Sequence, residues 1–282
     1  MKFVTKSILK EIYKKRDAWC HKGNFGKLLA ISGSKIYTGS PVFVGLSAYK
    51  AGCDMVYLTG PERAMNVAAS YSPLLMTRPL DGMYFGRDHI SKIINIINEI
   101  KPTAIVIGPG LSKLPEIKSA IIELVEKINL PMVIDADAIR ALSDVKEKLV
   151  NKKVVITPHT DEFKEFTGLN ISRDLKERIK KVREEAGKIK NVILLKGHVD
   201  VIASEKEVAL NKTGSPYMTK GGLGDTLTGI CGALLARGIE PFKAACAAAY
   251  INGLAGQIAA KEYKEGLTPL ELIENISKVI SV

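Results

Sequence analysis

The sequence has few cysteines and no long apolar run. Its 282 residues include only four cysteines, which are scattered and form no Cys-x-x-Cys pair. A disulfide framework or a zinc site is therefore not expected. We expect a reducing, cytoplasmic location instead. The N-terminal residues lack the apolar run of a signal peptide. The most apolar stretch, 244–260, falls short of the ~20 residues that span a bilayer. The sequence thus predicts no membrane partner and no metal held by protein side chains.

Aromatic residues are also scarce, at 6%. They offer no stacking platform for bases, and no basic helix or zinc-finger pattern appears, so we expect no nucleic-acid partner. Positive charge is abundant, because 41 Lys and Arg residues against 30 Asp and Glu residues give a net charge of +11. This surplus favours anionic ligands such as nucleotides and phosphorylated metabolites. A merely solvated basic surface is an equally good interpretation of composition alone.

Apolar runs bounded by turn residues alternate with segments of helical periodicity. The expected strands are Leu28–Ile31, Met55–Leu58, Ala104–Ile107, Met132–Ile134, Val154–Ile156 and Val192–Leu195. The expected helices are Val42–Ala51, His89–Ile100, Glu116–Ile128, Leu175–Ile189 and, after a hairpin at 199–210, Thr226–Arg237, Pro241–Ala260 and Thr268–Val279. Continuous apolar strands are typical of a parallel sheet that is buried on both faces. The pattern predicts a three-layer α/β/α fold with a mostly parallel central sheet, forming a single domain over 1–282 with a helical extension at 1–26.

The strongest local signal is a glycine-rich segment that leads into an apolar helix. It contains Gly221, Gly222, Leu223 and Gly224, and Asp225 stands at the start of the helix. Backbone N–H groups in such a loop and at a helix start bind phosphate. Asp225 could accept a proton from a substrate hydroxyl, but Asp is also a favoured helix cap. Both interpretations stay open on local chemistry, and the absence of a following Gly-Lys-Ser/Thr argues against a P-loop.

Two further strand ends carry groups suited to a ligand. In the segment 195–200, a glycine beside Lys196 could let a nucleotide approach the backbone while the lysine faces phosphate. In the segment 157–162, His159 would lie at the carboxyl edge of the sheet, where open α/β folds bind ligands. A plain turn and a structural histidine are the simpler alternatives for these two segments.

Glycines or acids follow several other expected strands, at 32–34, 108–111 and 135–137, and a glycine lies at 37–40 before the first long helix. Any one of them could be ordinary turn chemistry. Together they supply what a ligand crevice along one sheet edge requires.

These motifs, in this order, resemble the ADP/ATP-dependent NAD(P)H-hydrate dehydratases, a branch of the ribokinase-like superfamily, from about Lys27 to about Ala260. The segments that carry the resemblance are Tyr37-Thr38-Gly39-Ser40, Gly108-Pro109-Gly110-Leu111, Asp135-Ala136-Asp137-Ala138, Thr157–Glu162, Leu195-Lys196-Gly197 and Asn211–Asp225. The chain departs from the family's pattern at four positions, where Ser40 replaces Ala, Leu223 replaces Thr, Asp200 replaces a common Thr and Tyr217 replaces a usual Gly.

The resemblance implies an activity and a set of ligands. The substrate would be NADH or NADPH hydrated on the nicotinamide ring, and the phosphoryl donor would be ADP or ATP, with ADP favoured. Mg²⁺ would bridge the nucleotide phosphates. We expect a homo-oligomer, and an epimerase would have to be a separate chain, because only about 26 residues precede Lys27.

The resemblance also implies roles for individual residues. Asp225 would be the catalytic base. The residues placed on the hydrated cofactor are Ser40, Gly110, His159 and Asp225. Those placed on the nucleotide are Lys196, Gly197, His198, Val199, Asp200 and Gly224. The loop Gly221–Gly224 would hold the transferring phosphoryl group.

Two rival functions remain at this point. A ribokinase-like kinase of a small vitamin alcohol, of the hydroxyethylthiazole or hydroxymethylpyrimidine type, would use the same loop and stop after phosphorylation. The segments 37–40 and 157–162 argue against it. A nucleotide-binding regulatory module or a basic nucleic-acid binder would have no turnover.

Overall fold

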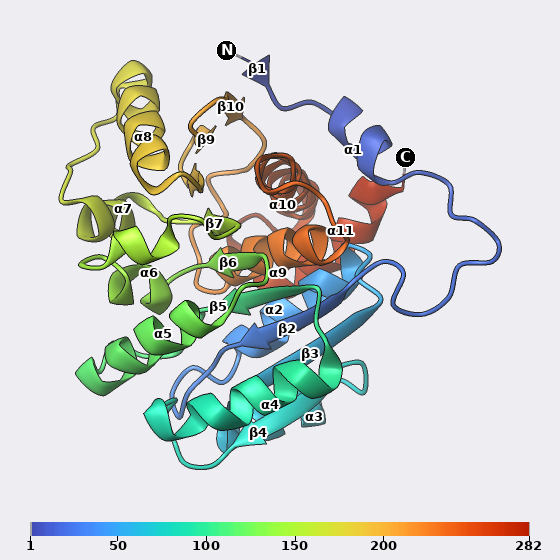
Figure 1. Ribbon diagram of the computed structural model, residues 1–282. Helices are drawn as coiled ribbons and strands as arrows, with labels where there is room; N and C mark the ends of the chain where they lie inside the picture. Colours follow the sequence, from blue (N-terminus) through green and yellow to red (C-terminus); the bar gives the residue numbers. More distant parts are fainter. Residues whose placement is uncertain (1, 282) are drawn as a thin grey trace.

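The computed structural model describes residues 2–281, which surround one sheet of ten strands (Figure 1). Across the sheet, the strand order is β1-β10-β9-β8-β7-β6-β5-β2-β3-β4. Neighbouring strands are parallel except at β9, which is antiparallel to both β8 and β10. The strands are β1 (Lys2–Phe3), β2 (Lys27–Ile31), β3 (Met55–Pro61), β4 (Met76–Leu80), β5 (Ala104–Ile107), β6 (Met132–Ile134), β7 (Val154–Ile156), β8 (Val192–Leu195), β9 (Asp200–Ala203) and β10 (Val208–Asn211).

Helices cover both faces of the sheet and make the three layers that the sequence predicts (Figure 1). The core on one face includes α2 (Ser40–Lys50), α3 (Glu62–Tyr71), α9 (Leu223–Ala236), α10 (Pro241–Tyr263) and α11 (Pro269–Ile280), together with the short α1 (Ser7–Ile12). The core on the other face includes α4 (Ile90–Ile100), α5 (Pro115–Lys127), α6 (Asp137–Ala141), α7 (Thr160–Thr167) and α8 (Leu175–Ile189). Three short 3₁₀ segments complete the chain, at Arg87–His89, Lys146–Leu149 and Lys264–Gly266.

The central strands explain why the apolar runs are continuous. All four residues of β5 are buried, and alternate side chains enter opposite cores, Val106 on one face and Ile105 and Ile107 on the other. A strand with helices on both faces has no solvent side to mark with polar residues. The predicted fold class is confirmed.

Other expectations were less accurate. The sequence pattern predicts neither the helices α3 and α6 nor the strand β4. The strand β4 lies at the edge of the sheet and has the sequence Met-Thr-Arg-Pro-Leu, with little apolar character. An edge strand tolerates proline and polar residues, since one side of its backbone lacks a partner. Within the described part of 1–26, helix is confined to α1, and Lys2–Phe3 instead pairs with β10. The single domain over 1–282 stays a prediction. No helix among residues 2–281 has the length and apolar character needed to cross a membrane.

Candidate active site

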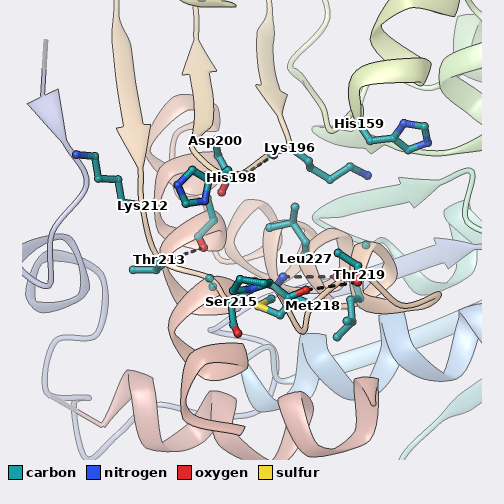
Figure 2. Close-up of a pocket in the computed structure, with 18 of the residues that line it drawn as sticks. His159, Lys196, His198, Asp200, Lys212, Thr213, Ser215, Met218, Thr219 and Leu227 are labelled. Atoms are coloured by element: carbon teal, nitrogen blue, oxygen red, sulfur yellow. Dashed lines mark hydrogen bonds between the residues drawn. The ribbon is translucent and has the colours of Figure 1, made fainter. Parts of the chain in front are cut away.

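The carboxyl ends of the parallel strands meet at one edge of the sheet, and a cavity of about 790 Å³ opens there (Figure 2). It lies where β7, β8 and β10 end and β9 begins, next to the first turn of α9 and the middle of α10. Of the residues predicted for the site, those that line it are His159, Lys196, Gly197, His198, Asp200, Leu223 and Gly224. The turn chemistry of separate strands therefore converges on one space.

The cavity wall is rich in positive charge. Lys196, Lys212 and Lys220 contribute ammonium groups, and Asp200 is the one acidic side chain in the wall. Figure 2 shows Lys212 at the β1 side, while Lys196 extends from the end of β8 towards His159. An elongated anion such as a nucleotide diphosphate matches this distribution of charge.

Asp200 is held in place by two hydrogen-bond donors. Its carboxylate accepts one bond from the backbone N–H of Gly197 at 2.9 Å and another from Nδ2 of Asn211 at 2.9 Å. Burial raises the pKa of Asp200 to about 6, and these two donors, followed by the nearby Lys196 and Arg178, oppose the increase. Asn211 is itself fully buried and also donates to the carbonyl of Ala249 on α10 at 3.2 Å. Asp200 thus ties the β8–β9 turn to the end of β10.

The anion loop ends in a left-handed glycine. Gly222 is the N-cap of α9 with a φ of +90°, and a Cβ there would lie 2.7 Å from the ring of Phe43, so glycine is required on both counts. The helix begins at Leu223, three residues before the predicted start, and the N–H groups of its first turn have no acceptor within the helix. Asp225 lies inside this turn and is not the cap. Its carboxylate is therefore not occupied by the capping role that local sequence left open.

Asp225 is half-buried and has other carboxylates nearby. Burial, followed by the carboxylates of Asp135 and, more weakly, Asp137, raises its pKa to about 6. The Ser40 hydroxyl and the Lys196 ammonium act in the opposite direction. A carboxylate with a pKa near 6 is ionised at neutral pH and holds a proton better than an ordinary aspartate, which suits a general base.

Lys196 lies between two buried carboxylates and the anion loop. Its Nζ is 3.1 Å from Oδ1 of Asp135 and 3.7 Å from Oε2 of Glu162. Burial alone would lower the pKa of Lys196, but the carboxylates of Asp135 and Glu162 outweigh it and raise the pKa overall. Nζ also lies 3.5 Å from where a Cβ on Gly224 would be. The ammonium is therefore charged and adjacent to the anion loop.

His159 serves as the N-cap of α7. Its Nδ1 accepts from the backbone N–H of Asp161 at 3.1 Å and of Glu162 at 3.4 Å, so the ring proton is assigned to Nε2. Nε2 lies 3.3 Å from Oε1 of Glu162, whose other oxygen accepts from the backbone N–H of His159 at 2.9 Å. The ring thus has a structural role and also borders the cavity.

Ser40 and Gly110 meet beside the cavity, outside its lining. Gly110 has a φ of +69°, and a Cβ there would lie 2.7 Å from Cβ of Tyr37 and 3.0 Å from Oγ of Ser40. Ser40 begins α2, whose contact with α9 brings the serine to Asp225. The predicted cofactor residues therefore fall into two groups, since Ser40, Gly110 and Asp225 lie together, whereas His159 lies with the predicted nucleotide residues.

Comparison with known proteins decides the family. Residues 28–278 match the model of the NAD(P)H-hydrate dehydratase family. The chain belongs to this family. It is 34% identical over 282 residues to the ADP-dependent (S)-NAD(P)H-hydrate dehydratase of Nitrosopumilus maritimus, with 99% of this chain and 96% of the relative covered. The resemblance seen in the motifs is thereby confirmed.

Other members of the NAD(P)H-hydrate dehydratase family are longer. The chain is 41% identical to the bifunctional NAD(P)H-hydrate repair enzyme Nnr of Pyrobaculum aerophilum over 267 residues, which cover 94% of this chain and 52% of that protein. The chain thus spans about half the length of the first relatives it matches. Among solved structures, the ADP/ATP-dependent NAD(P)H-hydrate dehydratase of Bacillus subtilis, co-crystallised with ATP and Mg²⁺, superposes with a TM-score of 0.83 at 28% identity over 99% of this chain and 97% of its own.

The structure of this dehydratase-family chain also shows what sequence reasoning missed. Six predicted positions do not line the cavity. Besides Ser40, Gly110, Gly222 and Asp225, these are Val199, which packs against a hydrophobic core, and Gly221, which is exposed. Three polar residues that no role was predicted for, Asp135, Glu162 and Thr228, form the buried support of Lys196. Asp135 and Glu162 lie in motifs that were recognised, so the signal was present. Thr228 lies in the middle of an apolar helix, where nothing in the sequence marks it.

Mg²⁺ was predicted as a bridge between nucleotide phosphates. Among residues 2–281, no group of three or more His, Cys, Asp or Glu side chains is arranged to hold a metal ion. Magnesium prefers a few carboxylates together with water and substrate phosphates over an all-protein cage.

Proposed function

We propose that this protein dehydrates hydrated NADH or NADPH and regenerates the reduced cofactor at the expense of a nucleotide, with ADP as the preferred donor. The observation that carries the proposal is the position of Asp225. It combines a pKa of about 6 with a place in the first turn of α9, next to the charged Lys196 and the anion loop. The names of the similar proteins support the substrate and the donor.

The reaction needs a better leaving group than hydroxide. Asp225 takes the proton of the ring hydroxyl, and the hydroxyl oxygen attacks the terminal phosphorus of the nucleotide, whose bridging P–O bond breaks to release AMP from ADP. The ring nitrogen then donates its electron pair as the C–O bond breaks and phosphate departs. Loss of a proton from the adjacent ring carbon restores the double bond. Positioning and charge stabilisation supply most of the catalysis in such a transfer.

The chain's own residues supply the binding and the charge. The first-turn N–H groups of α9 and the Lys196 ammonium face the transferring phosphoryl group, where fixed donors stabilise developing charge. Asp200 and the Gly197–His198 turn contact the rest of the nucleotide. Ser40 and Gly110 contact the hydrated ring beside Asp225. A bound Mg²⁺ would supply further charge neutralisation at the phosphates.

The family match over 28–278 favours this reaction over the vitamin-alcohol kinase, which stops after phosphorylation. A homo-oligomer, a cytoplasmic location and a separate epimerase stay predictions.

One assay tests the proposal. Hydrated NADH with Mg²⁺ and ADP should regain the near-ultraviolet absorbance of reduced nicotinamide, and one AMP and one phosphate should form for each cofactor repaired. A parallel reaction with ATP compares the donors. Recovery without nucleotide, or no recovery with either donor, would contradict the proposed function. A preference for ATP would change the donor alone.

A vitamin-alcohol kinase would behave differently in a matched reaction. It would consume nucleotide with hydroxyethylthiazole or hydroxymethylpyrimidine and leave the absorbance flat with the hydrated cofactor. The two reactions therefore separate the rival functions on one protein preparation.

A further inference from the structure

A buried carboxylate lies beneath the anion loop and has no role in the reaction as derived so far. Asp135 follows β6 and is 2% exposed. Its Oδ2 accepts a 2.6 Å hydrogen bond from Oγ1 of Thr228 on α9, and its Oδ1 lies 3.1 Å from Nζ of Lys196 at the end of β8. Buried charges are retained only with such partners, because an unpaired one costs several kcal/mol.

We infer that Asp135 is a positioning residue that holds the Lys196 ammonium beside Gly224 and places a second negative charge next to Asp225. This inference rests on the proposed function for its consequences in turnover. Thr228 anchors Asp135 to α9. The same helix carries Asp225, about one turn before Thr228. The same carboxylate therefore links the base, the lysine and the anion loop.

The geometry restricts Lys196 to one place. Asp135 and Glu162 draw the ammonium to 3.1 Å and 3.7 Å from their oxygens, so the flexible lysine stem has a defined end point. Preorganised charge acts on a developing phosphoryl charge without a reorganisation cost at the moment of reaction. A lysine without Asp135 would lose the nearer of the two carboxylates that fix its position.

The arrangement also places opposing charges around the base. Asp225 is faced by Asp135 from the end of β6, by Asp137 from α6 and by Lys196 from the end of β8, while Ser40 contributes a hydroxyl from α2. The two acids favour the protonated carboxyl, and the lysine favours the carboxylate. Removing Asp135 and removing Lys196 should therefore shift the titration of Asp225 in opposite directions.

The test is a titration of Asp225 that does not depend on turnover. Protein labelled with ¹³C at the Asp carboxyl carbons is followed by NMR from pH 4 to pH 8, and the Asp225 signal is assigned by its loss in Asp225→Asn. The wild-type midpoint should lie near 6. Asp135→Asn should lower the midpoint by on the order of one pH unit, the usual spread of pKa values in folded proteins. Lys196→Gln should raise it, and Thr228→Val, which retains both charges, should leave it in place.

The acidic limb of the kcat profile in the dehydratase assay should follow the same order. Asp135→Asn should also lower kcat more than tenfold without a matching increase in the nucleotide KM. Coincident midpoints for wild type, Asp135→Asn and Lys196→Gln would overturn the inference, whether or not the protein is a dehydratase. A lack of turnover in wild type with shifted midpoints would reject only the proposed function.

Two further outcomes are decisive. If Asp135→Asn changes only the Mg²⁺ concentration required for half-maximal activity, Asp135 is a metal ligand and the inference is overturned. If Asp135→Asn does not fold, the Lys196→Gln titration decides, and a midpoint that fails to rise overturns the inference.

Discussion

Two aspartates of the site, Asp200 and Asp225, each have a pKa that burial raises to about 6, but their surroundings differ. Both Asp200 oxygens are engaged, by the Gly197 N–H and the Asn211 amide. Asp225 has the Ser40 hydroxyl as its neutral partner and two further carboxylates nearby. Burial alone therefore does not mark a general base. The difference lies in whether the protein has already filled the carboxylate's acceptor positions, which it has at Asp200 and has not at Asp225.

The largest expected effect is on turnover at Asp225. Asp225→Asn should reduce kcat by ~10²–10⁴-fold, because the amide retains the shape but cannot accept the proton. Nucleotide affinity, measured by calorimetry, should stay near the wild-type value. Asp200→Asn is the matched control, and its kcat at saturating nucleotide should exceed that of Asp225→Asn by at least tenfold. Near-native turnover in Asp225→Asn would show that Asp225 transfers no proton and would remove the contrast between the two aspartates.

The next effect concerns the anion loop. Gly224→Val should block phosphoryl transfer, since the β-branched side chain would occupy the space beside Lys196 where phosphate binds. The fold should survive, because the nearest atom to a new Cβ is the Lys196 Nζ at 3.5 Å, an ordinary van der Waals distance. Gly187→Val is a suitable control, as a Cβ there has no atom within 4 Å. A folded Gly224→Val protein with an unchanged rate would show that the loop does not contact the phosphate.

A smaller effect is expected at His159, and it tests which ligand this residue serves. Because the family resemblance assigns His159 to the hydrated cofactor, His159→Ala should weaken binding of hydrated cofactor more than binding of nucleotide, each measured by calorimetry. The variant should also lose about 1 kcal/mol of stability with the helix cap. His159→Asn should keep the cap and lose only the imidazole. If both variants weaken nucleotide binding more than cofactor binding, His159 belongs with the nucleotide residues that it lies beside in the cavity.

The smallest effect is on stability against pH. The folded pKa of Asp225 is about 6 against an ordinary 3.8, so the folded state binds more protons between these values and stability falls as pH rises through that window. Asp225→Asn removes this loss and should raise the free energy of unfolding at pH 7 by about 1 kcal/mol. Thermal denaturation at pH 4 and pH 7 measures it.

Asp200→Asn should instead lower the free energy of unfolding at pH 7. Its amide would present a donor to either the Gly197 N–H or the Asn211 amide, which are themselves donors, and the lost hydrogen bond costs roughly 0.5–1.5 kcal/mol. Equal stability changes in the two variants would contradict the contrast drawn between them.

Much of the site could be predicted from the chain because its parts lie directly after buried strands. Lys196, His159 and Asp135 each follow an apolar run, and the carboxyl ends of parallel strands share one edge of the sheet. What could not be predicted was which of them would touch. The sequence grouped His159 with Ser40, and in the structure Glu162 joins His159 to Lys196.

The sequence by itself determined the layered fold and the family, because continuous apolar strands, turn residues and ordered motifs are local properties of the chain. Only the tertiary structure decided the chemistry of Asp225 and the support of Lys196. The contacts responsible join residues 61 and 93 positions apart, Lys196 to Asp135 and Thr228 to Asp135. Burial and Coulomb interaction depend on distance in space, and that distance does not exist until the sheet and its helices have packed.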